Sequence, residues 1–388
     1  MINVFQPTLG EQELAAVTDV FASGWLGRGA RTTAFVQEFA DHLGVAAEHL
    51  VPVNSCTEAL FTTIELLGIG ASDEVVMPSI SFVGAANAVA AAGARPVFCD
   101  VDPHTLNLTV DHLAAKINSR TSAVMLLHYG GYPGQLAEIA ALCDERGIPL
   151  IEDAACAVAS RADGRACGTV GAFGAWSFDA MKILVMGDGG MLYCREPNQA
   201  RRAAQLTYLG LGKTSGISQA VTSTQRWWEI DIECFGRRSS INDIDAAIGS
   251  VQLRRLPQFV ARRREIVERY ETGLAGLEGL RQPPALPAGH TSSYYFYWVG
   301  LTGGIRDEVA RHLYERGIYT TFRYHPLHLV AAYGSDARLP GAERAAEETL
   351  CLPLHQGMDD AMVEKVIDET RAAVLACREA GRLSAQEV

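Results

Sequence analysis

The sequence predicts an α/β protein in which a large domain with a mostly parallel sheet is followed by a smaller α/β domain. In the first two-thirds of the chain, short apolar runs alternate with stretches of helical periodicity, as in successive strand–helix–strand units. A long helical pattern begins at Asn242, is interrupted near Pro257 and continues to Tyr270, which predicts a helix that bridges two domains. We therefore expect the large domain, with an N-terminal arm, at residues 1–245, and the bridging helix with the small domain at residues 246–388.

The composition supports two cores and disfavours several classes of function. The chain has 388 residues, 48% of them hydrophobic, which is enough to fill a large and a small core. A net charge of −12 argues against a nucleic-acid partner, although local basic residues can still bind a charged small molecule. Nine cysteines without paired metal-type spacing are typical of reduced thiols in a cytoplasmic protein. We find no signal peptide and no long apolar run, and therefore expect no membrane partner.

The expected strands and helices follow one another along the chain. A strand at 50–55 leads into a helix at 56–67, whose apolar residues recur on one face. Further strands of the large domain are expected at 75–77, 96–98, 123–127, 149–151 and 191–193. After two prolines at 283 and 284, strands are expected at 294–299 and 318–322, and helices at 306–316 and 362–379.

Lys182 is the first candidate for chemistry. It stands between Met181 and the apolar run at 183–186, just ahead of a glycine-rich turn at 187–190. Removal from water disfavours the charged form of a lysine, so this setting predicts a lowered pKa and a nucleophilic amine that can hold an aldehyde cofactor. Taken alone, the pattern also fits a lysine whose stem covers apolar surface while its charge stays in water.

A carboxylate is expected near that lysine. The apolar run at 147–151 is followed directly by Glu152 and Asp153. Buried parallel strands commonly end in this way, with polar residues at the carboxyl end. Ligands of open α/β sheets bind in the crevice at these ends, so we expect Asp153 to face it. Pyridoxal phosphate needs a carboxylate there, because a negative charge keeps its ring nitrogen protonated.

The junction between the strand at 50–55 and the helix after it is a candidate anion site. Free amides and the positive end of the helix dipole favour a phosphate at Ser55 to Thr57, and the separate Ser177 can add a hydroxyl. The alternative is ordinary capping of the helix by the Ser55 side chain.

Six strings spread along the chain carry a family resemblance: SCTEAL (55–60), PSISFVGAANAV (78–89), GARPVFCDVDPHTLNL (93–108), IEDAACA (151–157), SFDAMK (177–182) and AAIGSVQLRRL (246–256). In this order they resemble the sugar aminotransferases of the DegT/DnrJ/EryC1/StrS family, and the likeness runs nearly end to end. The resemblance implies fold-type I pyridoxal phosphate chemistry.

The resemblance also assigns roles to individual residues. It implies that Lys182 bonds covalently to the cofactor and that Asp153 pairs with the ring nitrogen. Ser177 and the turn at Cys56 and Thr57 would bind the phosphate. Phe82 would stack on the ring, although an aromatic residue after a strand is also common in cores.

Four positions depart from the family pattern, one of them Ser240, which stands where many members have Arg. Cys156, expected near the cofactor face, stands where the family commonly has Gln or His, and Cys56 stands where it commonly has Gly. Arg238 occupies the position of an Asn that reaches the phosphate of the neighbouring subunit. Its fork of donors also suits phosphate oxygens, whereas the alternative is that Arg237 and Arg238 form a solvated surface pair.

The implied activity is transfer of an amino group, with the cofactor alternating between its pyridoxal and pyridoxamine forms. The family suggests L-glutamate as donor and a nucleotide-linked keto-deoxysugar, or less often a keto-cyclitol, as acceptor. It also suggests homodimers with shared active sites, in which Arg238 acts in the partner's site.

Substrate contacts are expected from Trp25, Tyr324, His325 and His328, which lie in family-like loop segments. We expect no metal, because the two histidines have no third ligand nearby and Pro326 disfavours a helical pair.

Three other functions compete with this interpretation. Sugar dehydratases that resemble the family carry His at the lysine position, which Lys182 disfavours. A non-catalytic regulator on the same fold stays open. An ATP-dependent enzyme using Gly212-Lys-Thr214 is disfavoured, because a P-loop needs glycine where Thr207 stands.

Overall fold

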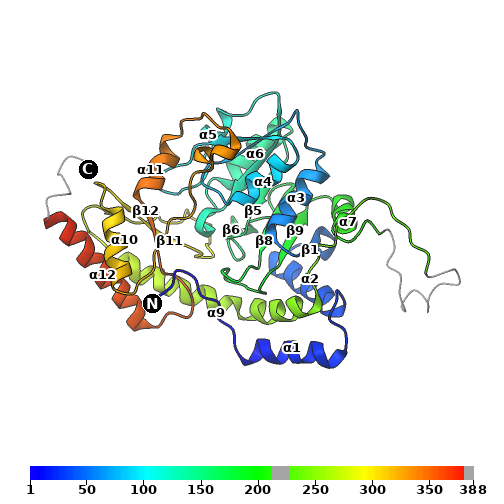
Figure 1. Ribbon diagram of the computed structural model, residues 1–388, viewed down its shortest axis with the longest axis horizontal. Coiled ribbons are helices and arrows are strands. Elements are labelled where there is room, and N and C mark those ends of the chain that lie inside the picture. Colours follow the sequence, from blue (N-terminus) through cyan, green and yellow to red (C-terminus); the bar gives the residue numbers. More distant parts are fainter. Residues whose placement is uncertain (212–227, 380–388) are drawn as a thin grey trace.

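The computed structural model describes residues 1–211 and 228–379, and its centre is a seven-stranded sheet (Figure 1). The strand order is β1-β9-β8-β5-β4-β2-β3. Strand β9 pairs antiparallel with both β1 and β8, and the remaining neighbours pair in parallel. The predicted mostly parallel sheet is therefore confirmed. The strands are β1 (Leu50–Val53), β2 (Glu74–Pro78), β3 (Arg95–Cys99), β4 (Thr121–Leu127), β5 (Leu150–Asp153), β8 (Phe173–Ser177) and β9 (Gly190–Cys194).

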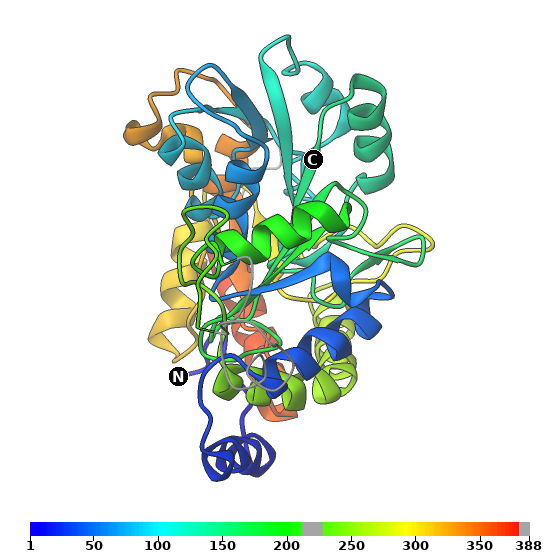
Figure 2. The ribbon, with the colours of Figure 1, turned by 90° about the vertical axis from the view of Figure 1, so that its right-hand side faces the viewer.

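Helices connect these strands and cover the sheet (Figure 2). Helices α3 and α4 pack on each other, and α3 also contacts β8 and β9. On another side, α1 and α2 lie along the long helix α9. The helices of this part are α1 (Glu11–Ser23), α2 (Ala30–Leu43), α3 (Cys56–Leu66), α4 (Val83–Ala91), α5 (Val110–Ala114), α6 (Leu136–Arg146), α7 (Pro197–Leu206) and α9 (Asp243–Gly273).

Helix α9 is continuous, which corrects the break expected near Pro257. The Asn242 side chain caps it by accepting the amides of Ile244 at 2.8 Å and Asp245 at 3.2 Å. A proline removes one backbone hydrogen bond, and packing against α1 and α2 holds the axis through this site. Sequence periodicity could not reveal that support, because both packing helices come from the start of the chain.

The small domain is a three-stranded antiparallel sheet with helices packed on it. The expected strand at 318–322 is wrong, since only isolated bridges form there, from Ile318 to Ile2 and from Thr321 to Cys351. Its elements are β10 (Leu280–Arg281), β11 (Tyr297–Leu301), β12 (Thr349–Leu352), α10 (Arg306–Glu315), α11 (Pro340–Glu348) and α12 (Asp360–Glu379). A separate small ribbon joins β6 (Arg161–Ala162) to β7 (Arg165–Ala166).

The N-terminal residues belong to this small domain. The Ile2 amide donates to the Gly317 carbonyl at 2.7 Å, and the Ile2 carbonyl accepts from the Tyr319 amide at 2.9 Å. The Ile2 side chain is buried in the same hydrophobic cluster as Val299.

Two hydrophobic clusters fill the protein, and α9 contributes to both. Its Leu256 and Phe259 join the large cluster around the sheet, whereas Ile266 and Tyr270 join the smaller one. These contacts favour two domains that share α9, and the boundary after residue 245 stays a prediction.

Arg263 ties α9 to the small domain. This fully buried guanidinium donates to the carbonyls of Tyr294 and Leu354 at 3.0 Å each and to the Gln356 side chain at 2.9 Å. Burial lowers the pKa of Arg263 to about 10.

None of the helices within 1–211 and 228–379 is long and apolar enough to span a membrane. None of the nine cysteines, all of which lie in the described parts of the chain, forms a disulfide, and eight of them are buried.

Candidate active site

A cavity of ≈ 190 Å³ lies where the carboxyl ends of β5 and β8 meet the first turn of α3. It is the crevice in which the parallel sheet is expected to bind ligands. Seven of the predicted site residues line it: Cys56, Thr57, Phe82, Asp153, Ser177, Lys182 and Tyr324.

Asp153, the last residue of β5, is buried in the wall of this cavity. Its Oδ1 accepts the Ala155 amide at 3.0 Å and lies 3.8 Å from the Cys56 thiol that donates to it. Burial raises the pKa of Asp153, while the Ala155 amide and the charge of Lys182 act in the opposite direction. The carboxylate is therefore poised to stabilise a cationic partner placed against it.

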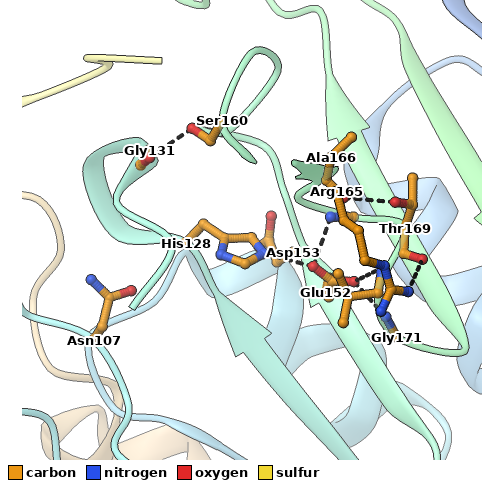
Figure 3. A network of polar contacts seen from close by, with 12 residues as sticks. Asn107, His128, Gly131, Glu152, Asp153, Ser160, Arg165, Ala166, Thr169 and Gly171 are labelled. Carbon is orange, nitrogen blue, oxygen red and sulfur yellow. Dashed lines mark hydrogen bonds and ion pairs between the residues drawn. The ribbon is translucent and has the colours of Figure 1, made fainter. Parts of the chain in front are cut away.

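Glu152, its neighbour on β5, holds the surrounding loop instead (Figure 3). Side chains alternate along a strand, so the two acids point to opposite faces. Glu152 is fully buried and accepts the amides of Gly168, Val170 and Gly171 at 2.7, 2.7 and 2.5 Å. It also bonds His128 Nε2 at 2.9 Å. The sequence run ending in two acids thus contains one residue of the cavity and one that anchors the loop 168–171 to the sheet.

Lys182 projects into the cavity from the loop between β8 and β9. Asp179 shapes this loop, since its carbonyl accepts the Lys182 amide and its carboxylate accepts the Met181 amide, both at 2.9 Å. The Lys182 Nζ lies 4.8 Å from the centre of the Tyr295 ring.

The expected lowering of the Lys182 pKa is wrong. Burial does act downward, but Tyr295, Cys156, Asp153 and Cys56 outweigh it and raise the pKa of Lys182 above its usual value. These neighbours arrive from distant parts of the chain, so the local apolar run could not reveal them. The amine is a cation in this arrangement, and it becomes a nucleophile only after losing a proton.

The first turn of α3 leaves amides available to an anion. Ser55 is the N-cap, because its Oγ accepts the Glu58 amide at 3.1 Å, so the capping alternative holds for this side chain. The amides of Cys56 and Thr57 have no hydrogen-bond partner within the described residues. A Cβ on Gly190 would lie 2.7 Å from the Cys56 nitrogen, so only glycine lets β9 approach this turn. Together with the Thr57 and Ser177 hydroxyls, the turn is suited to bind phosphate.

Aromatic residues form another wall of the cavity. Phe82, at the N-cap of α4, is 48% exposed, which a core residue would not be. Its ring centre lies 5.7 Å from that of Tyr324. The thiol of Cys156 is buried, and burial raises its pKa to about 11. Cys156 itself does not line the cavity.

The remaining predicted residues lie outside the cavity of this subunit. Trp25 is 60% exposed and donates from Nε1 to the Arg28 carbonyl at 3.2 Å. His325 and Arg238 are exposed. Arg237, by contrast, is not simply solvated, since it forms ion pairs of 2.9 Å with both Glu58 and Glu65 of α3.

His328 supports the loop rather than facing the cavity. Its side chain is buried, with Nδ1 2.6 Å from the Ser79 hydroxyl and Nε2 3.3 Å from the Glu343 carboxylate. Both ring nitrogens are thus engaged by the protein.

Sequence reasoning missed several residues of the cavity wall, among them Tyr295 and Arg323. Tyr295 falls in an aromatic run that looks like a core strand, and only the fold brings it to Lys182. Arg323 precedes a segment that was recognised, but no local pattern singles it out.

Residues 212–214, the possible phosphate loop, lie outside the described residues. Within the described part of the chain, no cluster of three or more His, Cys, Asp or Glu side chains is arranged to hold a metal.

A mostly parallel seven-stranded sheet, with a lysine and a buried carboxylate at one cavity beside a helix N-terminus, defines a fold-type I transferase. The comparisons with known proteins agree. A model of the DegT/DnrJ/EryC1/StrS aminotransferase family matches residues 7–371. The chain belongs to this family. The predicted family and enzyme class are therefore confirmed.

Three relatives illustrate the likeness. The dTDP-4-dehydro-2,3,6-trideoxy-D-glucose 4-aminotransferase of Saccharopolyspora spinosa is 56% identical over 374 residues, covering 96% of this chain and 97% of the relative. The crystal structure of the aminotransferase TlmJ from Streptoalloteichus hindustanus is 67% identical with a TM-score of 0.93, covering 97% of this chain and 99% of TlmJ. DesV from S. venezuelae, solved in complex with a ketimine intermediate, is 31% identical with a TM-score of 0.83, covering 93% and 94%.

Proposed function

We propose that this aminotransferase uses pyridoxal 5'-phosphate to move an amino group from L-glutamate to the keto group of a nucleotide-linked deoxysugar. The observation that carries the proposal is one cavity holding Lys182, Asp153 and the free amides of α3.

The residues present fit the cofactor at three points. Two unbonded amides and the Thr57 hydroxyl at the start of α3, with the Ser177 hydroxyl at the end of β8, suit its phosphate. The buried carboxylate of Asp153 suits a protonated ring nitrogen, and the half-exposed ring of Phe82 offers a flat face for stacking. Lys182 enters the same cavity with an amine able to bond the aldehyde.

When bound, the cofactor supplies an electron-accepting ring that carries the amino group from donor to acceptor. Asp153 holds the proton on the ring nitrogen, because a charge pair inside this buried wall favours the protonated ring. Lys182 Nζ, once released, moves a proton between the donor carbon and the cofactor carbon. The Asp179 turn keeps that amine over the cavity.

The proposed acceptor follows from the relatives. The Saccharopolyspora spinosa relative is named for transfer to carbon 4 of a dTDP-linked deoxysugar, which supports a nucleotide-linked 4-keto sugar here. A keto-cyclitol is the second candidate, and a non-catalytic regulator is the third.

The test combines cofactor binding with turnover. Addition of pyridoxal phosphate to the purified chain is expected to give a visible absorption band and a covalent adduct at Lys182, both absent from Lys182→Ala. Glutamate and a panel of nucleotide-linked 3-keto sugars, 4-keto sugars and keto-cyclitols would then identify the acceptor by the mass of the aminated product. A chain that stays colourless with no adduct refutes the proposal, and a coloured chain that aminates nothing favours the regulator.

We also propose that the enzyme is a homodimer whose sites are shared. Leu14 and Phe21 on α1 are exposed, and Phe235, three residues before Arg238, is 97% exposed. A second copy would remove these apolar side chains from water and would bring Arg238 to the phosphate of the partner's site. Mixing the inactive Lys182→Ala and Arg238→Ala variants should then restore activity, because a mixed dimer holds one intact site. A purified enzyme that sediments as a monomer would refute the proposed homodimer. A cytoplasmic location is part of the same proposal.

A further inference from the structure

We propose that Arg323 binds a carboxylate of the amino-acid donor, and that Phe5 and Tyr295 position its guanidinium. This inference rests on the proposed function, and it assigns the part of the cavity that recognises the donor.

Arg323 is a cation without an anion. Its side chain is partly buried in the cavity wall, and within residues 1–211 and 228–379 it has no carboxylate partner. Its contacts are a long one from Nη2 to the Met181 sulfur at 3.6 Å and one to the Phe5 ring. Most other arginines of the described chain pair with acids, so an unpaired guanidinium at a cavity wall indicates a ligand anion.

The charges of the cavity favour the donor as that ligand. Lys182 and Arg323 are the two cations among its described lining residues, which also include the carboxylates of Asp153, Asp179 and Asp188. Lys182 is committed to the cofactor and to proton movement, and the first turn of α3 is committed to phosphate. Arg323 is therefore the remaining cation in the described wall for a donor that carries two carboxylates.

A stack of two aromatic rings fixes where this cation lies. The Arg323 guanidinium lies 4.8 Å from the centre of the Phe5 ring. Phe5 in turn stacks on Tyr295, with 5.4 Å between the ring centres and 20° between the planes. Lys182 Nζ contacts the Tyr295 ring at 4.8 Å. The reacting amine and the carboxylate site are thus placed relative to each other by the same pair of rings.

The buried side of this stack is also positive. Arg263 donates to the Tyr294 carbonyl at 3.0 Å, next to Tyr295 in the segment that precedes β11. It has no carboxylate among its bonded partners in the described structure, which are carbonyl oxygens and the Gln356 side chain. Its charge adds to the attraction of an anion towards Arg323.

The experiment measures binding and the two half-reactions separately in the cofactor-loaded, full-length enzyme. Glutarate, a dicarboxylate with no amine, serves as a binding probe in calorimetry and does not depend on turnover. We expect Arg323→Met to weaken glutarate binding and to raise the glutamate concentration for half-saturation by about 10- to 100-fold. Arg323→Lys should lose less, and Phe5→Leu about two- to fivefold. The acceptor half-reaction should keep its half-saturation in every variant.

Two controls keep the result clear. Arg338→Met removes an arginine whose side chain is 87% exposed and should change neither quantity. A thermal melt confirms that Arg323→Met is folded, and Arg323→Lys gives a second, milder variant.

L-Glutamine and L-isoglutamine each lack one carboxylate of glutamate and identify which carboxylate Arg323 binds. The half-saturation of the amide that lacks that carboxylate should be insensitive to Arg323→Met.

Either of two outcomes overturns the inference. One is wild-type glutarate affinity in Arg323→Met. The other is a raised half-saturation for the sugar nucleotide with an unchanged donor step, which would mean that Arg323 binds the diphosphate. Failure of the proposed function is distinguishable, since the wild-type enzyme would then accept no amino group from glutamate while glutarate titration still reports on Arg323.

Discussion

Glu152→Gln is expected to destabilise the protein strongly without altering any atom that lines the cavity. The change keeps the size of the side chain but replaces one oxygen by an NH2 group. In the structure, Oε1 accepts the amides of Val170 and Gly171, and Oε2 accepts the Gly168 amide and bonds His128. Oε1 can keep both of its bonds in the variant, whereas the new NH2 group faces the Gly168 amide, a donor facing a donor.

The expected loss has two parts. Leaving the buried Gly168 amide without an acceptor costs about 1–3 kcal/mol. Replacing a charged acceptor by a neutral one weakens each remaining bond by about 1 kcal/mol, since bonds to charged groups are worth roughly 1.5–3 kcal/mol and neutral ones roughly 0.5–1.5 kcal/mol. The free energy of unfolding should therefore fall by about 3–5 kcal/mol.

Urea unfolding followed by circular dichroism and by cofactor absorbance would measure this loss. Glu145→Gln is the matched control, because Glu145 is exposed on α6 and should change stability by no more than about 0.5 kcal/mol. A loss below about 1 kcal/mol in Glu152→Gln would contradict the account of the network in Figure 3.

Three other changes test separate features. Asn242→Ala removes the cap of α9 and should lower the free energy of unfolding by about 1 kcal/mol in urea titrations, whereas an unchanged midpoint would argue that the cap is dispensable. Tyr295→Phe removes a buried hydroxyl that has no hydrogen-bond partner in the described structure, so it should leave stability unchanged or raise it by about 1 kcal/mol, and a clear loss would reveal an unseen partner. Burial and the charge of Arg263 lower the pKa of His355 from 6.5 to about 4. Between these pH values the unfolded chain binds a proton at His355 that the folded chain does not bind. Stability should fall by about 3 kcal/mol as the pH drops from about 6.5 towards 4, and His355→Gln should make that fall shallower in urea titrations at pH 7, 5 and 4.

Local patterns in the sequence were sufficient for most of the sheet and for much of the cavity. The strand ending at Asp153 and the junction at Ser55 both follow from an apolar run that stops at a polar residue. The residues of each such pattern lie close together in the sequence, so the pattern can be interpreted without knowledge of the fold.

Features that depend on contacts between distant segments could not be predicted from the sequence. The acidic surroundings of Lys182 come from segments between 26 and 126 residues away, and Tyr295 lies 113 residues from the lysine. The continuity of α9 through Pro257 depends on helices from the start of the chain. His328 was expected near substrate because its neighbours in sequence are, yet Ser79 and Glu343 draw its ring into the interior. Proximity along the chain does not decide which way a side chain turns.

The pairing of Ile2 with Gly317 and Tyr319 has a consequence for how the polypeptide matures. Ile2 cannot reach its place until more than three hundred later residues have been made. Because Phe5 follows directly and stacks on Tyr295, the wall beside Lys182 is completed only when the two halves of the gene product have met. A nascent chain halted before residue 317 would carry a finished sheet and an unfinished catalyst.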